Sequence, residues 1–216
     1  MDLYLTHPAE SEAGSWVESE GGSSRGNQLW RNLGDWRFED VTEKSGTRGG
    51  NRSVFTALWL DVNNDRFPDL YATHEFGNGV LLVNNGDGTF AEDSLIPSGY
   101  SGFGSMGATC GDVNNDGNID LYLAQMYSKA GKRVIGNLRE DSYNPEIMGK
   151  LRRLVTGSQL YLNRGDQTFD RVGNEKQVAA VGWAYGPALV DLDNDGWLDI
   201  HATCGYISRS RTKPDG

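Results

Sequence analysis

Several features that mark common protein classes are scarce or missing in this sequence. The 216 residues include only two cysteines, Cys110 and Cys204, which are too few for a disulfide framework and lack the spacing of a zinc motif. One disulfide bridge and two buried thiols are both compatible with this pair. No run of 18 apolar residues is present, so we predict no membrane-spanning helix. The opening segment 1–7 has neither a basic nor an apolar region, and we do not expect it to act as a signal peptide.

Positive charge is also in short supply. The chain has 20 Lys and Arg against 30 Asp and Glu, a formal net charge of -10. Proteins that bind nucleic acid present a basic face to the phosphates, so we predict no nucleic-acid partner. The motifs of serine hydrolases, zinc proteases, phosphate loops and dinucleotide-binding folds are missing as well. The sequence therefore identifies no catalytic residue and no organic cofactor.

Glycine, in contrast, is abundant, and it accompanies a repeated acidic pattern. It makes up 29 of the 216 residues, which suits a chain with many tight turns because glycine adopts positive φ without steric cost. Three acidic segments align without gaps: Asp61–Leu70, Asp112–Leu121 and Asp191–Ile200. Each begins Asp-x-Asn/Asp-Asn-Asp and places another Asp at position 9. Repetition of this kind predicts repeated structural units.

A second motif alternates with the acidic one. It reads Leu-x-x-Asn-x-Gly-Asp-x-x-Phe and occurs at Leu29–Phe38, Leu81–Phe90 and Leu160–Phe169. In the second copy, the Asn-Gly-Asp-Gly segment at 85–88 lies between apolar flanks and predicts a β-hairpin. Short apolar segments before and after each acidic loop predict two more strands. The repeat period, from Asp61 to Asp112, is 51 residues. Four short strands within such a period correspond to one propeller blade.

We therefore predict an all-β fold: a partial β-propeller of four-stranded antiparallel blades with calcium loops, about three blades' worth, and one short helical insertion. The predicted divisions are a partial blade over 1–47, a blade over 53–93, a blade over 103–172 with an insertion at 126–157, and a partial blade over 181–216. Residues 1–4 match the end of the acidic motif, so we expect the chain to begin in mid-repeat. Unpaired blade edges favour association, and we expect self-association, with two chains completing one ring as one arrangement.

Two insertions interrupt the repeats. Residues 8–27 are rich in Glu, Ser and Gly and are predicted to form a solvated loop, in which Trp16 either contacts a ligand such as a sugar or holds the loop in place. Residues 126–157 carry seven Lys and Arg against three Asp and Glu. Asn144 before Pro145 predicts a helix N-terminus. One face of this helix would carry Ile147, Leu151, Leu154 and Val155. It is either a rim helix with solvated charges or a cationic lid for an anionic ligand.

The acidic loops have the chemistry of a calcium site. Asp and Asn at positions 1, 3 and 5 bring hard oxygen atoms together, position 7 offers a backbone carbonyl, and the Asp at position 9 closes the shell of about six to eight oxygens. An EF-hand would need Glu at position 12, where this chain has Ala72, Leu123 and Ala202. Mg²⁺ and Zn²⁺ suit these oxygen ligands less well. The alternative without a metal is that these residues only form Asx-turns.

The predicted ligands follow from these positions. They are Asp61, Asn63, Asp65, Phe67 and Asp69 in the first loop, Asp112, Asn114, Asp116, Asn118 and Asp120 in the second, and Asp191, Asp193, Asp195, Trp197 and Asp199 in the third. Carboxylate count raises calcium affinity, so we expect the third loop to bind most strongly. The first should bind most weakly, because Arg66 replaces the turn glycine at position 6.

The acidic loop, together with Phe103–Gly111 before the second copy, resembles the FG-GAP (VCBS) repeat of integrin-α-type propellers. The segment Gly182–Asp191 and the hairpin motif are most similar to bacterial secreted proteins of the ASPIC/UnbV kind. This resemblance implies a propeller fold, Ca²⁺ as cofactor, and an extracellular, cell-surface or periplasmic location. It implies no particular activity, because the fold serves many functions.

We predict a calcium-binding module for extracellular ligand or protein binding and adhesion, with a protein or a glycan as partner and no membrane insertion. The alternative is part of a carbohydrate-active propeller enzyme of the lyase or dehydratase type, which would need acidic and basic groups converging in a central channel. A purely structural scaffold is a third possibility. His7 and His74, five positions beyond the Asp that ends their motifs, are candidate ligands or bases, with structural hydrogen bonding as the alternative. Trp59, Trp183 and Trp197 are predicted to be core residues.

Overall fold

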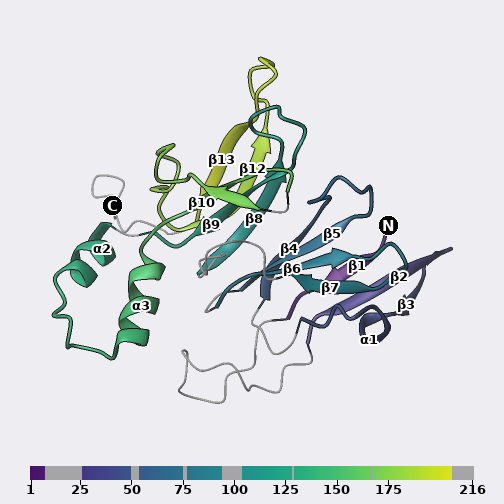
Figure 1. Ribbon diagram of the computed structural model, residues 1–216, viewed down its shortest axis with the longest axis horizontal. Helices are drawn as coiled ribbons and strands as arrows, with labels where there is room; N and C mark the ends of the chain where they lie inside the picture. Colours follow the sequence, from purple (N-terminus) through teal and green to yellow (C-terminus); the bar gives the residue numbers. More distant parts are fainter. Residues whose placement is uncertain are drawn as a thin grey trace.

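The computed structural model of the protein contains four antiparallel β-sheets that follow one another along the chain (Figure 1). It describes residues 1–7, 26–49, 54–74, 77–93, 104–127, 129–166 and 168–205. The sheets have three, four, four and two strands, so the predicted all-β fold with four-stranded antiparallel sheets is confirmed. We refer to them as sheets 1 to 4.

The strand bounds place one acidic loop between the first two strands of each of sheets 2 to 4. Sheet 1 contains β1 (Leu3–Leu5), β2 (Gln28–Gly34) and β3 (Arg37–Asp40), followed by the one-turn helix α1 (Thr42–Ser45). Sheet 2 contains β4 (Val54–Leu60), β5 (Asp69–His74), β6 (Val80–Asn84) and β7 (Phe90–Asp93). Sheet 3 contains β8 (Ser105–Gly111), β9 (Asp120–Gln125), β10 (Gln159–Asn163) and β11 (Phe169–Arg171). Sheet 4 contains β12 (Ala184–Val190) and β13 (Asp199–Cys204).

The sheets pack face against face, so a strand in the middle of the molecule is buried on both sides. In β5, Leu70 and Tyr71 are both completely buried although they point to opposite faces. Tyr71 belongs to a core shared by sheets 2 and 3, with Leu121 and Tyr161 from sheet 3. Leu70 belongs to the core on the other face, to which sheet 1 contributes Tyr4. This explains why the strand sequence is an apolar run rather than an alternating one.

The first strands of sheets 2, 3 and 4 lie next to one another. β8 packs against both β4 and β12, whereas the last strands lie at the opposite edges of their sheets. Sheets that meet through their first strands and fan out toward their last strands have the radial arrangement of propeller blades. The order in the sheets is sequential, β4-β5-β6-β7 and β8-β9-β10-β11, as expected for up-and-down blades.

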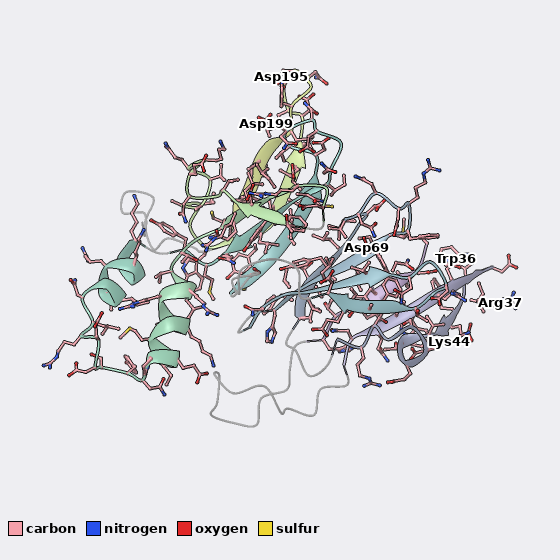
Figure 2. All side chains as sticks on the ribbon, viewed as in Figure 1. Trp36, Arg37, Lys44, Asp69, Asp195 and Asp199 are labelled. Atoms are coloured by element: carbon pink, nitrogen blue, oxygen red, sulfur yellow. The ribbon has the colours of Figure 1, made fainter. Side chains whose placement is uncertain are left out.

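Because neighbouring strands alternate in direction, the acidic loops and the second-motif hairpins lie at one end of the sheets, which we call the loop end. The labelled Asp195 marks it in Figure 2. The connection from β9 to β10 lies at the other end and carries two helices, α2 (Lys129–Gly136) and α3 (Pro145–Leu154), which project away from the sheets (Figure 1). Neither of these helices, nor α1, is long and apolar enough to cross a membrane.

The helix predicted after Asn144 is present. The side chain of Asn144 accepts a hydrogen bond from the backbone N–H of Ile147 (2.8 Å), which is an N-cap. Met148 is the buried residue of α3, whereas Ile147, Leu151, Leu154 and Val155 are half-buried. Sequence periodicity does not reveal which side chains of this helix the rest of the molecule covers. The sequence also did not predict α2, which has no buried residue.

We expect the insertion to be dispensable for folding. Both of its ends are anchored without the helices: Tyr127 N–H donates to the carbonyl of Gly182 (3.2 Å), and Ser158 N–H donates to that of Ala179 (2.9 Å). Replacing residues 129–155 by a short glycine-containing linker should lower the free energy of unfolding by at most about 3 kcal/mol, roughly the value of burying one methionine. Far-UV circular dichroism and urea denaturation would measure this. Complete loss of soluble folded protein would show that the helices belong to the core.

The structure corrects the sequence-based expectations for the two cysteines and for Trp197. Cys110 and Cys204 are both free, and Cys204 is exposed, so they form neither a bridge nor a pair of buried thiols. Burial raises the pKa of the Cys110 thiol. Trp197 is 53% exposed and is not a core residue, unlike Trp59, which packs against Phe90. Trp16 and most of the predicted 8–27 loop lie outside the described residues.

The exposure of Trp197 has a structural reason. In sheet 2 the residue at loop position 7, Phe67, lies over the hairpin glycine Gly86, where a Cβ would come within 2.8 Å of the ring. Phe67 is nevertheless 46% exposed, so a side chain at this position projects along the loop end even where a hairpin lies beside it. Trp197 occupies the same position in sheet 4, whose described part has only two strands, and is exposed to a similar degree.

Candidate metal centre

The three acidic loops share one backbone conformation. Position 4 is an Asn in the left-handed region in every copy, with φ values of 59°, 56° and 59° at Asn64, Asn115 and Asn194. Position 6 is left-handed as well, at 72° for Arg66, 88° for Gly117 and 89° for Gly196. Two left-handed residues so close together fold the chain back on itself. Asn accepts this conformation more readily than most residues, and Gly accepts it freely.

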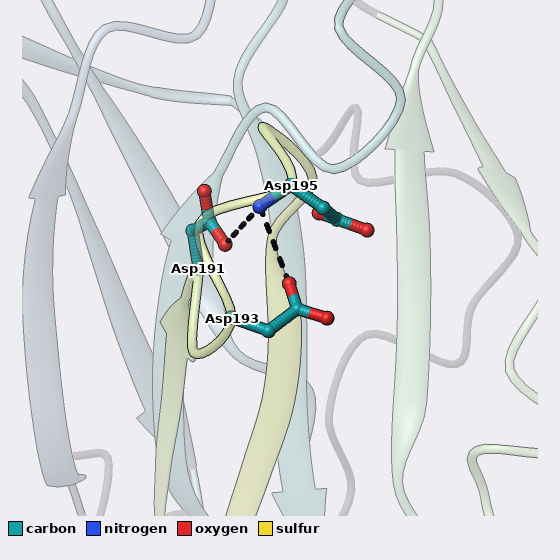
Figure 3. A group of neighbouring side chains, drawn as sticks. All are labelled: Asp191, Asp193 and Asp195. Carbon is teal, nitrogen blue, oxygen red and sulfur yellow. Dashed lines mark hydrogen bonds between the residues drawn. The ribbon is translucent and has the colours of Figure 1, made fainter.

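This turn is locked by hydrogen bonds that bring positions 1, 3 and 5 together. In the third loop, the backbone N–H of Asp195 donates to carboxylate oxygens of both Asp191 (3.1 Å) and Asp193 (3.2 Å), as Figure 3 shows. The other oxygen of Asp191 accepts the N–H of Gly196 (2.9 Å). The same bonds recur in the other two loops within 0.1 Å. The side chains of positions 1 and 3 are thus oriented by the backbone before any ion arrives.

The third loop differs from the other two in the number of carboxylates that it brings together. One ligand atom from each of Asp191, Asp193 and Asp195 lies within 4.8 Å of the others, and this is the one such acidic group found among the described residues. In the first two loops position 3 is Asn, whose amide donates to the carboxylate of position 5, at 2.8 Å in Asn63–Asp65 and 2.9 Å in Asn114–Asp116. These bonds relieve part of the negative charge there. The third loop has no such amide and gathers three carboxylates.

The position-5 carboxylates also accept backbone hydrogen bonds. Asp65, Asp116 and Asp195 each accept the N–H of the position-7 residue at 2.8 Å. This bond, with those from the amides of Asn114 and Asn118, holds the pKa of Asp116 below its ordinary value. An ionised carboxylate at this position is the form that a cation would bind.

The Asp at position 9 has a second role that the sequence did not reveal. Asp69 and Asp120 are completely buried, and each carboxylate accepts two backbone N–H groups. One comes from loop position 2, Val62 or Val113 (both 2.9 Å), and the other from the third strand, Asn84 or Asn163 (both 2.8 Å). Burial raises the pKa of both carboxyls, and these hydrogen bonds oppose the rise. The carboxylate fastens the acidic loop to the hairpin of its own sheet.

A signal for this role was present in the sequence, because the Asn of the second motif is the donor in each complete sheet. The pair also occurs in sheet 1, where Asn32 N–H donates to Asp2 at 2.9 Å. In sheet 4, Asp199 accepts the N–H of Leu192 (3.2 Å) and is exposed. It is not in the group formed by the other three carboxylates of its loop, so its predicted place in the metal shell stays a prediction.

The three loops are joined to one another. The amide of Asn64 in the first loop donates to the side chain of Asn118 in the second (3.0 Å), and Asn115 in the second donates to the carbonyl of Gly196 in the third (3.1 Å). Position 4 of one loop therefore contacts position 6 or 7 of the next. The predicted ligands lie in one continuous row along the loop end rather than at three separate places.

Arg66 is expected to strain the first loop. Its φ of 72° is unfavourable for a residue with a Cβ by about 1–2 kcal/mol. We expect Arg66→Gly to raise the free energy of unfolding of the metal-free protein by about 0.5–1 kcal/mol, the gain being reduced by the greater freedom of glycine in the unfolded chain. Arg66→Ala is the control, since it removes the charge and keeps the strain. Urea denaturation with EDTA would measure both, and an equal gain from the two variants would contradict the strain argument.

A hollow of 490 Å³ lies beside the first loop, between sheets 1 and 2. Its wall includes three aromatic rings, those of Trp59, Phe67 and Phe90. Polar groups come from Asp2 and Arg31 in sheet 1 and from Asn84 in sheet 2. An apolar hollow of this size with a few polar groups has the character of a small-ligand site. His7 and His74 do not line it, and in the described part of the chain they join no cluster of three metal-ligating side chains.

Comparison with known families agrees with this geometry. A family model described as the FG-GAP-like repeat matches residues 61–123 and 154–202. The two matches together cover slightly more than half of the chain and contain all three acidic loops. A search of curated proteins finds no match. The finer similarity to ASPIC/UnbV-type proteins stays a prediction.

Proposed function

Since the chain belongs to the FG-GAP-like repeat family, we propose that it is a calcium-binding β-propeller module that binds a protein or glycan ligand at an extracellular, cell-surface or periplasmic location. The observation that carries the calcium part is the third loop, where three carboxylates converge with their oxygens oriented by backbone N–H groups. The repetition of this conformation in the other two loops supports three sites of graded strength.

The donor set fits calcium better than other common ions. Each loop offers only oxygen ligands: carboxylates, Asn side-chain oxygens and the backbone carbonyl of position 7. Ca²⁺ accepts about six to eight such oxygens in irregular geometry, whereas Mg²⁺ demands a regular octahedron and keeps several waters. Zinc prefers nitrogen and sulfur. The residues that would hold the ion are those of positions 1, 3, 5 and 7, with position 9 tying the loop to its sheet.

Isothermal titration calorimetry tests the metal assignment. The chelated protein should bind Ca²⁺, with the strongest site lost in Asp193→Ala, and it should bind Mg²⁺ more weakly. Asp35→Ala, in the exposed β2–β3 turn of sheet 1, is a matched acidic control that should leave all calcium sites in place. Absence of calcium binding by the parent protein would overturn the assignment.

The ligand would occupy the hollow between sheets 1 and 2. Aromatic faces such as those of Trp59 and Phe90 suit the apolar side of a sugar ring or a peptide side chain, and the Arg31 and Asp2 side chains offer hydrogen bonds of both kinds. The hollow lies next to Phe67 and Pro68 of the first loop, so we expect EDTA to weaken binding. The location of the ligand is inferred from the hollow and does not depend on the metal assignment.

A glycan array tests it, with Arg31→Ala as the variant expected to lose binding and Arg37→Ala as the control outside the hollow. Unchanged binding by Arg31→Ala would show that the ligand binds outside this hollow. The same preparation should be assayed for lyase activity on anionic polysaccharides. Cleavage would favour the carbohydrate-active enzyme over a binding module.

A further inference from the structure

The packing between sheets 2 and 3 shows which contacts neighbouring sheets of this protein make. Val62, at position 2 of the first loop, is only 2% exposed because sheet 3 covers it. Its carbonyl accepts a hydrogen bond from the side-chain amide of Asn163 on β10 (2.8 Å). The side chain of Val62 thus makes an apolar contact between sheets 2 and 3, and its carbonyl makes a polar contact with Asn163.

Sheet 4 presents the same contact surface, and among the described residues no further sheet packs on it. Leu192 occupies the position of Val62 and is 65% exposed, and Val190 beside it is 39% exposed. The opposite face of the sheet is covered, since a Cβ at Gly111 of β8 would lie 2.7 Å from Leu198 and 3.5 Å from Leu189. The exposed face of sheet 4 is therefore the one that, in sheet 2, packs on the following sheet.

Sheet 1 presents the complementary surface. Leu3 and Leu5 occupy the positions of Leu70 and Ala72 in sheet 2, yet they are 46% and 44% exposed where Leu70 and Ala72 are buried. Leu3 pairs with Trp30 across the strands, so the two side chains share this face.

Asn32 supplies the polar contact on the same face. The backbone N–H of Asn32 donates to Asp2 (2.9 Å), and its side-chain oxygen accepts the N–H of Gly34 (2.8 Å). Asn163 makes the same two hydrogen bonds, with Asp120 and with Gly165. Among the described residues its Nδ2 has no acceptor, whereas the Nδ2 of Asn163 reaches the carbonyl of Val62.

We propose that these two faces bind each other between two copies of the chain. Sheet 4 of one copy packs on sheet 1 of the second copy in the register of sheets 2 and 3. Leu192 lies against Leu3 and Trp30, and the carbonyl of Leu192 accepts a hydrogen bond from the Nδ2 of Asn32. The interface continues an interface already present inside the chain, and it brings two faces with exposed leucines together.

The contact is heterologous, since the two faces differ, and such contacts form either rings or open filaments. The described residues of two copies supply eight sheets, twice the four of one copy, which is within the range of about four to eight blades found in propellers. The expected assembly is a closed dimer with two equivalent interfaces.

Sedimentation velocity of the calcium-loaded full chain is the first test. The parent should sediment as a dimer, and Leu192→Asp should raise the dissociation constant by about 30-fold or more, as expected for a central interface residue. Leu192 is exposed in the single chain, so this change spares the fold. Val134→Asp is the control: it is also an exposed apolar residue, on α2 and away from both faces, and should leave the dimer intact. A parent that stays monomeric at all concentrations would overturn the proposal.

Cross-linking tests the register. Leu192→Cys and Asn32→Cys are made separately in a Cys204→Ser background, because Cys204 is exposed. Under oxidation, the mixture should give a covalent dimer that neither variant gives alone. If the dimer persists in Leu192→Asp, or if the mixture gives no more cross-link than each variant alone, the two chains associate through another surface and the proposal is wrong.

Discussion

Calcium is expected to raise the melting temperature of the protein, and Asp195→Ala is expected to remove more of that rise than Asp65→Ala. An ion that binds only the folded state at 100 times its dissociation constant adds about 2.7 kcal/mol to the free energy of unfolding. For a chain of this size that corresponds to roughly 5–10 °C. The third loop should provide most of this gain, because three carboxylates converge there and repel one another until a cation neutralises them.

The two aspartates are a matched pair. Each carboxylate accepts the N–H of its position-7 residue at 2.8 Å, and both loops have the same backbone bonds between positions 1, 3 and 5. Their replacement should therefore cost similar stability in EDTA, and the difference should appear only with calcium. Scanning calorimetry of both variants with and without Ca²⁺ measures it. Equal losses would contradict the ranking of the loops, and an absent calcium response in the parent would contradict the metal assignment.

Asp120→Ala is expected to destabilise the protein strongly even without calcium. The carboxylate is completely buried and accepts the N–H groups of Val113 (2.9 Å) and Asn163 (2.8 Å). Alanine would leave two backbone donors without an acceptor, at about 1–3 kcal/mol each. We expect the free energy of unfolding in EDTA to fall by about 2–5 kcal/mol.

Asp199→Ala is the matched control, since this residue has the same place in its loop but is exposed and accepts the N–H of Leu192 at 3.2 Å. Its loss should cost less than about 1 kcal/mol. Urea denaturation of both variants in EDTA provides the comparison. Equal effects would show that the buried bonds to the hairpin do not hold the acidic loop in place.

Much of the loop end was predictable because its structure is local. The hydrogen bonds that shape each acidic loop join residues two to five positions apart, as in Asp195 with Asp191 and Gly196 with Asp191. The hairpin motif and the N-cap at Asn144 act over similarly short distances. Local bonds of this kind recur wherever the same short sequence recurs. The repeat therefore predicted the loops, the hairpins and the number of strands in each sheet.

The sequence by itself thus determined the blade pattern and the chemistry of the acidic loops. Only the tertiary structure decided how these parts are used. The bond between Asp120 and Asn163 joins residues 43 positions apart, and the bond between Asn64 and Asn118 joins residues 54 apart. The exposure of Leu192, where Val62 at the same loop position is buried, depends on which sheet packs over it. Such contacts depend on how whole sheets pack, and a sequence pattern that is the same in every repeat cannot distinguish a covered copy from an uncovered one.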